Sequence, residues 1–229
     1  MQSCLPTMSA LVIAFFSVLA AQLCCFAYAS VVGQVHTFRD IASHLLLPSG
    51  APLAGAYIAV YWSFGAMPES YYDEEVFRLR YVLYQLVCVD ALMTLAHVAI
   101  HRKLLGGDFY SFSHAPHHTH TPPRMTDAFD GSVVDTTSLI VAPLFAMSRF
   151  VHATTYEYMV FGVVWSTLLT LIHSPSDHVW ETTLLWKGCL LATASDHRRH
   201  HKHPSQNQGH IFKLWDIVLR QITRARVSL

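Results

Sequence analysis

Histidines form the pattern in this sequence with the clearest chemical meaning, and they fall into three short motifs. These motifs are His97-x3-His101, His114-x2-His117-His118 and His197-x2-His200-His201. Residues three or four positions apart share one face of a helix, so two imidazoles of one motif can point at the same metal ion. Adjacent histidines diverge by about 100° around a helix, so one helix can serve two neighbouring metals. Histidine sets without cysteine suit iron, zinc, copper or nickel and disfavour a structural zinc finger.

The composition points to a lipid environment. The chain has 229 residues, of which 52% are apolar and 13% charged, against about 45–50% and about 25% in ordinary globular proteins. This length allows one domain or a small membrane body. The formal net charge is zero, which gives no electrostatic reason to expect nucleic acid as a partner. The five cysteines show no C-x-x-C spacing, so we interpret them as reduced packing residues.

Five apolar runs are candidates for membrane helices. They cover residues 10–29, 45–67, 81–100, 136–148 and 158–172. The first is long enough to cross a bilayer core of about 30 Å. We favour a retained helix over a signal peptide there, because no positive residue precedes the run. In the second run, Pro48 and Pro52 place the helical part after Ala51. The fourth run extends only about 20 Å, so it either crosses at a tilt or dips into the membrane.

The order of these runs brings the histidine motifs to one side of the membrane. The first motif ends the third run and the second motif follows it; the last two runs then form a hairpin that returns the chain to His173 and the third motif. The acidic connector 69–75 is expected on the opposite side. Basic residues gather on the histidine side: Arg102, Lys103, Arg124, Lys187, Arg198, Arg199, Lys202 and Lys213. By the positive-inside tendency, the histidine side is cytosolic.

These features predict an all-α integral membrane protein. We expect about four to five transmembrane or membrane-dipping helices and a cytosolic helical cap that holds a dimetal histidine site. Segment 182–195 is expected to form an interfacial helix that covers this site. Asp90 lies inside an apolar run, where ionisable residues are site candidates. It is two turns, about 10 Å, from His97, so a buried hydrogen bond and an indirect effect on the metal are both open.

Eight histidines lie outside the three motifs. His173 and, five residues later, His178 precede the third motif, and His178 is a further candidate ligand. Three others lie close to the motifs without completing a pattern: His120, His203 and His210. We interpret the remaining three as ordinary histidines at polar edges: His36, His44 and His152.

Further signals surround the three motifs. Asp90 precedes the first motif, His173-Ser174 precedes the third, and a tail with Asn207-x-Gly209 and Leu214-Trp215-Asp216 follows it. With these signals, residues 90–216 resemble the sterol desaturase and fatty acid hydroxylase superfamily of integral membrane di-iron enzymes. The sequence departs from the family pattern at four places: at Pro175 instead of glycine, at Gln208 instead of tyrosine, at 217–219 without Phe-Gly, and at Asp130, where some sterol members carry histidine.

The resemblance implies a catalytic domain over 81–219, preceded by membrane helices and a connector over 1–80 and followed by a short tail over 220–229. It implies a di-iron centre, with zinc as a substitute metal, held by the eight motif histidines and His173. Asp90, Asn207, Trp215 and Asp216 would support this site, and we expect Trp215 and Asp216 to pin the tail against the histidine helices. The implied activity is that of an O2-dependent oxidoreductase of the endoplasmic reticulum membrane that hydroxylates or desaturates a sterol, sphingolipid or fatty acyl chain. Its electrons would come from cytochrome b5 and a NAD(P)H reductase.

Three alternatives stay open. An acyl-CoA desaturase has comparable histidine motifs, but the tail from Asn207 to Asp216 argues against it. A histidine-rich membrane protein that binds or transports metal is the alternative without catalysis. The third is a non-catalytic member of the same family, motivated by Pro175 and by the absent Phe-Gly.

Overall fold

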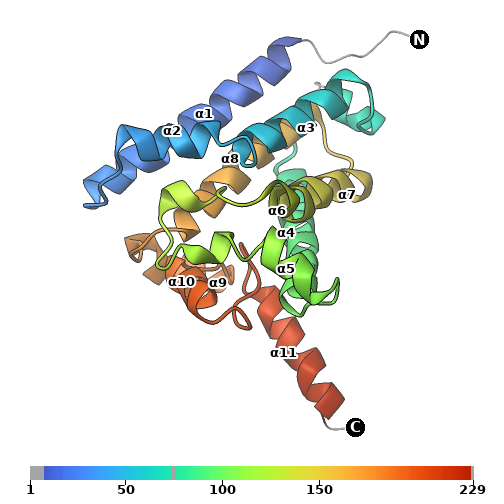
Figure 1. Ribbon diagram of the computed structural model, residues 1–229. Helices are drawn as coiled ribbons and strands as arrows, with labels where there is room; N and C mark the ends of the chain where they lie inside the picture. Colours follow the sequence, from blue (N-terminus) through green and yellow to red (C-terminus); the bar gives the residue numbers. More distant parts are fainter. Residues whose placement is uncertain (1–7, 74–75, 228–229) are drawn as a thin grey trace.

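The computed structural model describes residues 8–73 and 76–227, and these form helices joined by short loops (Figure 1). The α-helices are α1 (Met8–Val31), α2 (Phe38–Leu46), α3 (Ala51–Ser63), α4 (Leu79–His101), α5 (Gly107–Ser113), α6 (Val133–Thr136), α7 (Ala142–Phe150), α8 (Thr155–Ile172), α9 (Leu184–Gly188), α10 (Ala194–Lys202) and α11 (Leu214–Val227). Short 3-10 turns are η1 (Glu69–Tyr72), η2 (His117–Thr119), η3 (Met125–Asp127) and η5 (Val179–Thr182), and η4 (Thr137–Val141) is a π-helix. Extended pairing in the described part is confined to one bridge between Leu191 and Phe212.

Five helical segments are long and apolar enough to cross a membrane. They are Val12–Val31, Phe38–Ser63, Leu79–His101, Val133–Phe150 and Thr155–Ile172. The predicted all-α fold with up to five spans is therefore confirmed, and the chain is a multi-pass membrane protein. Of the acidic connector 69–75, residues 74–75 lie outside the described residues.

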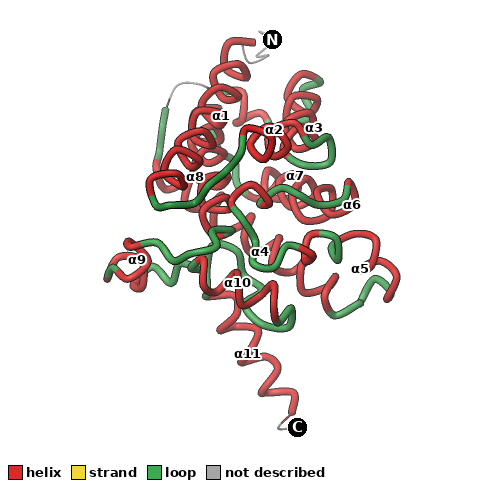
Figure 2. The backbone as a smooth tube through the Cα atoms, turned by 60° about the vertical axis from the view of Figure 1, so that its left-hand side comes forward, coloured by secondary structure: helices red, strands yellow, loops and turns green. Residues whose placement is uncertain are grey.

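Helices α1, α4 and α8 run in the same direction, toward the end of the molecule that carries the histidine motifs. Gln22 of α1 accepts a hydrogen bond from Thr170 of α8 at 2.7 Å. Tyr28, further along α1, contacts His178, which lies beyond the end of α8. At the other end, the Arg78 guanidinium just before α4 pairs with Glu157 in the first turn of α8 at 2.9 Å. Figures 1 and 2 show α10 and α11 at the end of the molecule opposite the N-terminus.

An aromatic core holds the far ends of these helices together. Tyr158 of α8 lies 5.3 Å, between ring centroids, from both Trp62 of α3 and Tyr71 of η1. The Tyr71 hydroxyl donates to the carbonyl of Val151 at 2.6 Å. Buried aromatic pairs contribute packing energy beyond the area they bury. These contacts hold α3, η1 and α8 together at the end of the molecule opposite the histidine motifs.

The fourth predicted run is longer than expected. A continuous helical path runs from Val133 to Phe150, which is 18 residues, or about 27 Å. Pro143 lacks the N–H that an α-helix interior needs, and the π-helix η4 directly precedes the helix that carries it. A π-helix changes the hydrogen-bond register of the helix locally. The helical segment therefore continues past Pro143 to Phe150.

Two expectations about the remaining segments are wrong. Only Leu184–Gly188 is α-helical within the predicted interfacial helix 182–195 before α10 begins. The predicted domain bounds stay a prediction; α11 continues past residue 219 to Val227. His44 is not at a polar edge: it is buried, and its ring nitrogens contact the Thr126 carbonyl at 3.0 Å and the Gln22 side chain at 3.2 Å. It belongs to α2, a helix that the apolar pattern missed but whose capping box at Thr37 was visible in the sequence.

Candidate metal centre

The histidine motifs are carried by the ends of several elements. His97 and His101 occupy the last two turns of α4, and the third motif lies on α10. The second motif is not on a regular helix, contrary to expectation: His114 follows the end of α5, and His117 begins the 3-10 turn η2. A turn over residues 114–116, which contains Pro116, separates α5 from η2, and this bend brings the motif under the ends of α4 and α8.

The nine predicted ligands are brought together in two groups. The five-histidine group contains His97, His101, His114, His118 and His200, and the four-histidine group contains His117, His173, His197 and His201. Within each group, one nitrogen of every residue lies within 4.8 Å of the others. The adjacent pairs 117/118 and 200/201 divide between the groups, as the divergence of neighbouring side chains predicts. That these residues bind metal stays a prediction.

Hydrogen bonds fix the orientation of five of the nine imidazoles. The Nδ1 atoms lie 2.6–3.0 Å from protein oxygens in the pairs His97 with Gln208 O, His114 with Asp135 Oδ1, His117 with Asp130 O, His173 with Leu169 O, and His200 with Gln206 O. An oxygen acceptor assigns the ring proton to Nδ1, which leaves a lone pair on Nε2. In these five rings, the lone pair of Nε2 is therefore available to bind a metal.

The distances between these Nε2 atoms fit a cation. The Nε2 atoms of His97 and His114 lie 3.0 Å apart, although the Nδ1 contacts leave both with lone pairs. Two lone pairs at this distance repel each other, and a cation between them removes the repulsion. Metal–nitrogen distances of about 2.0–2.1 Å place two ligands of one ion about 3 Å apart. The Nε2 atom of His200 is buried and has no hydrogen-bond partner among the described residues, which also fits a missing ligand bond.

Burial keeps these imidazoles neutral. The pKa of His200 is lowered to about 4, chiefly because burial removes hydration from the charged form. Burial likewise lowers the pKa of His114 and of His197, and neighbouring imidazoles lower both further. Since a metal binds the unprotonated ring, this environment favours a metal over protons.

Asp135 is a site residue that the sequence reasoning missed. Its carboxylate accepts the Nδ1 proton of His114 at 2.8 Å, and both side chains are buried. The Ser132 hydroxyl accepts from the backbone N–H of Asp135 at 3.0 Å and fixes the start of α6. A carboxylate behind a ligating histidine raises the basicity of that ligand and holds its ring. The sequence signal was weak: a serine cap and one acid at the start of an apolar run.

Asp90 acts on the tail of the chain. Its carboxylate accepts hydrogen bonds from the backbone N–H groups of 210–212 at 2.8–3.3 Å and from the Trp215 indole at 3.0 Å. The tail in turn presents the Gln208 carbonyl to His97. The contact of Asp90 with the site is therefore indirect, and the expected buried hydrogen bond is present.

The second half of the tail motif completes this clamp. The Asp216 carboxylate accepts from the N–H groups of Gln208 and Gly209 at 2.7 and 3.2 Å. A Cβ atom at Gly209 would lie 2.5 Å from the Phe212 carbonyl oxygen, so glycine is required there. Asn207 has a positive φ of 50° and donates to the Asp196 carbonyl on α10 at 3.0 Å. Together these contacts pin the tail against α4 and α10.

Three other histidines are not brought into either group. Both ring nitrogens of His178 are engaged, one with the Tyr28 hydroxyl and one with the Leu171 carbonyl, each at 2.9 Å. His120 lies with Asp127 and Asp130 in a separate cluster. His203 is exposed. The candidate ligand His178 therefore joins α1 to the end of α8 through hydrogen bonds and lies outside both histidine groups.

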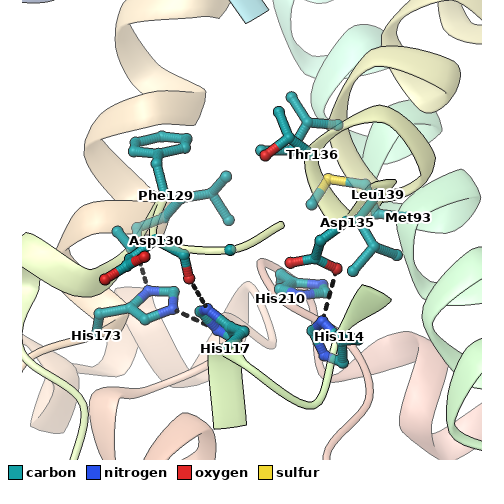
Figure 3. Close-up of a pocket in the computed structure, with 14 residues that line it drawn as sticks. Met93, His114, His117, Phe129, Asp130, Asp135, Thr136, Leu139, His173 and His210 are labelled. Atoms are coloured by element: carbon teal, nitrogen blue, oxygen red, sulfur yellow. Dashed lines mark hydrogen bonds and ion pairs between the residues drawn. The ribbon is translucent and has the colours of Figure 1, made fainter. Parts of the chain in front are cut away.

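A small cavity adjoins both groups (Figure 3). Its volume is about 40 Å³, and its walls include His114 from one group and His117 and His173 from the other. The remaining walls are largely apolar and come from α4, η4, α8 and the loop before α6: Met93, Ala128, Phe129, Leu139, Ile140 and Leu169. The cavity therefore places apolar side chains beside the histidines, together with the polar residues Asp130, Asp135 and Thr136.

Comparisons with known proteins agree with this geometry. Residues 82–221 match the model of the fatty acid hydroxylase family. A curated relative, named alternative squalene epoxidase, from Phaeodactylum tricornutum, is 36% identical over 184 residues. The match covers 79% of this chain and 52% of the relative, so the chain spans about half the length of the curated relative. No solved structure matches the chain.

Proposed function

Because the chain belongs to the fatty acid hydroxylase family, within the sterol desaturase and fatty acid hydroxylase superfamily, we propose that it is a membrane-bound oxidoreductase that uses O2 to oxidise the hydrocarbon part of a lipid. The observation that carries this proposal is the pair of histidine groups beside an apolar cavity at the ends of membrane helices. An imidazole-only donor set suits iron, with zinc as a substitute because it has the higher intrinsic affinity.

The two histidine groups would each hold one iron ion. When bound, the iron pair supplies the reduction of O2 and the oxidising power that an unactivated C–H or C=C bond requires. For hydroxylation, the balance is lipid C–H, O2, two electrons and two protons giving the alcohol and one water. Desaturation takes the same inputs and gives an alkene and two waters.

The protein's own side chains orient the ligands and exclude water. Asp135 and the carbonyls of Asp130, Leu169, Gln206 and Gln208 hold five rings in the tautomer that leaves Nε2 free. The apolar cavity wall binds the chain of the lipid, which enters from the bilayer. The cavity is small, at about 40 Å³, so only a short part of the lipid chain would lie beside the histidines.

Epoxidation is a second candidate reaction. It is favoured by the relative named alternative squalene epoxidase, which is 36% identical to this chain. Epoxidation of a C=C bond takes O2, two electrons and two protons and gives the epoxide and one water, so it requires no different site. Squalene is a pure hydrocarbon, which fits a cavity with apolar walls.

We propose that electrons come from an acidic donor of the cytochrome b5 type, reduced by a NAD(P)H reductase. A surface groove of about 250 Å³ beside the third motif is lined by Ser195, Arg198, Arg199, Lys202 and His203. Its positive charge would attract an acidic partner through steering that salt weakens. The location proposed for the protein is the endoplasmic reticulum membrane, with this groove facing the cytosol.

The test combines metal analysis with isotope labelling. We expect two transition-metal ions per purified chain, and less than one per chain would contradict the proposal. Membranes containing the chain, a NAD(P)H reductase and cytochrome b5 are supplied with 18O2 and with squalene, a sterol or a fatty acyl lipid. An 18O-labelled alcohol or epoxide identifies oxygen insertion, and an unlabelled alkene identifies desaturation. Bound metal without any oxidised lipid would favour the non-catalytic or metal-binding alternatives.

A further inference from the structure

A tenth histidine, His210, lies between the two ligand groups and belongs to neither. Its ring centroid is 4.7 Å from that of His97 in the five-histidine group and 6.0 Å from that of His197 in the four-histidine group. Its nitrogens are not among those that gather within 4.8 Å of one another in either group. The residue is 7% exposed and lines the cavity that touches both groups.

The side chain of His210 has no protein partner for its polar atoms. Its Nδ1 atom is buried without a hydrogen bond, and no hydrogen bond to Nε2 is found among the described residues. An imidazole carries at least one N–H in either protonation state. Leaving a buried polar atom such as this Nδ1 unpaired is costly, whether it donates or accepts. Because His210 lines the cavity, its ring is expected to find a hydrogen-bond partner in whatever enters the cavity.

The position of His210 is built by the fold. Its backbone N–H donates to Asp90, and the carboxylates of Asp90 and Asp216 hold the residues on either side. The ring is thus fixed from the tail, while the ligands around it come from α4, α10 and the loops. In the view of Figure 3, His210 appears between His114 and His117, and all three residues line the cavity.

The geometry points to a catalytic contact, and we propose that His210 donates a hydrogen bond to the oxygen atom as it passes to the lipid, without binding a metal itself. This inference rests on the proposed oxygenase function. Under the proposed function, the reacting carbon or C=C bond lies in the cavity beside the histidines, and His210 lines the same cavity. A fixed donor aimed at a developing negative oxygen stabilises it, because the donor needs no reorganisation. Without this donor, more of the O2 that is consumed would be reduced without oxidising the lipid.

The test compares His210→Phe, which removes both nitrogens and keeps a ring, with His210→Gln, which restores an N–H at the end of the side chain. His152→Phe, at an exposed histidine of the loop before α8, is the matched control. The readouts are metal ions per chain and oxidised lipid formed per O2 consumed. We expect all variants to retain two metals per chain. The product yield per O2 should fall by about tenfold in His210→Phe, as expected for one lost hydrogen bond, and should recover partly in His210→Gln.

Two results would overturn the inference. A fall to about one metal per chain in His210→Phe would make His210 a ligand. An unchanged yield per O2 in His210→Phe would show that the ring only fills space. If the unmodified chain forms no oxidised lipid, the proposed function itself fails, and that outcome is seen before any variant is compared.

Discussion

At the scale of single residues, the two groups divide the motif histidines in a way that sequence spacing alone only partly anticipates. His97 and His101 act together, but His200 joins them from a motif about one hundred residues later. Its ring nitrogens connect the Gln206 carbonyl to the five-histidine group. Loss of one such ligand leaves an incomplete site and a cavity in its place.

We therefore expect His117→Ala and His200→Ala to abolish product formation and to bind less than the full two metals. His152→Ala should retain most of the activity, because His152 is exposed on the loop before α8. Product yield and elemental analysis of the three purified variants check this. Equal product formation by all three variants would mean that the two histidine groups do not carry the reaction.

The Asp135 carboxylate should tune the five-histidine group through His114. Asp135→Asn keeps the shape but removes the charge behind the His114 ring, and metal affinity should fall by about 10–100-fold. Competition with a chelator of known affinity measures the change. Asp108→Asn is the control, because Asp108 is exposed on α5. An Asp135→Asn chain with unchanged affinity would mean that the carboxylate only caps α6.

The stability of the metal-free chain should depend on pH through His200. Its pKa is about 4 in the folded chain and 6.5 ordinarily, so the unfolded chain binds the proton more readily. Stability from this residue is therefore complete above about pH 6.5 and is lost as the pH falls toward about 4. The loss is on the order of 3 kcal/mol for a shift of this size. Unfolding of metal-free protein between pH 8 and 4 checks the direction, and His200→Asn should make the curve less steep, while buried histidines such as His114 and His197 keep their own part of the pH dependence.

The sequence predicted the patterned histidines because their spacing is a local property. It did not predict Asp135, which is 21 positions from His114, or the buried place of His210. Both contacts depend on how loops return to the ends of α4 and α8. A single polar residue at the edge of an apolar run looks the same whether it faces a ligand or solvent.

At the scale of elements, the tail from Asn207 to Asp216 is the piece that closes the site. It connects the Asp90 carboxylate in α4 to the carbonyl that orients His97. The sequence pattern predicted that Trp215 and Asp216 would pin this tail, and their contacts with Asp90 and with the 208–209 backbone confirm it. It could not predict the bend at the second motif, because H-x2-H-H is equally compatible with a helix and with a turn.

Replacing Asp90 should loosen this closure. Asp90→Leu leaves the N–H groups of 210–212 and the Trp215 indole without an acceptor, at about 1–3 kcal/mol for each buried unsatisfied group. We expect a lower unfolding temperature and faster loss of metal to a chelator. Asp108→Leu, at the exposed position on α5, provides the comparison. If only the unfolding temperature falls and metal loss is unchanged, the tail does not orient His97.

At the scale of the whole molecule, five spans and the direction of α1, α4 and α8 place both the histidine groups and the basic groove at one end. The opposite end holds η1 and the loop before α8, joined by the Tyr71 hydroxyl to the Val151 carbonyl. Hydropathy predicted the spans, since a bilayer imposes length and apolarity on each of them. It could not give the pairing of the helices, which depends on side chains such as Gln22 and Thr170 meeting across 148 positions.

The last prediction concerns which end faces the cytosol. In a chain whose own cysteines are replaced, single cysteines at Ser205 and Glu69, both exposed, should react from opposite sides of the membrane. Ser205 lies beside the basic groove, so the positive-inside tendency predicts that it is labelled by an impermeant reagent from the cytosolic side, while Glu69 is labelled only after the membrane is opened. Labelling of both from one side would contradict the odd number of spans between them. A Ser205 that is reached only from the lumen would place the groove away from any cytosolic electron donor, and the proposed electron supply would then be wrong even if the histidine groups bind iron.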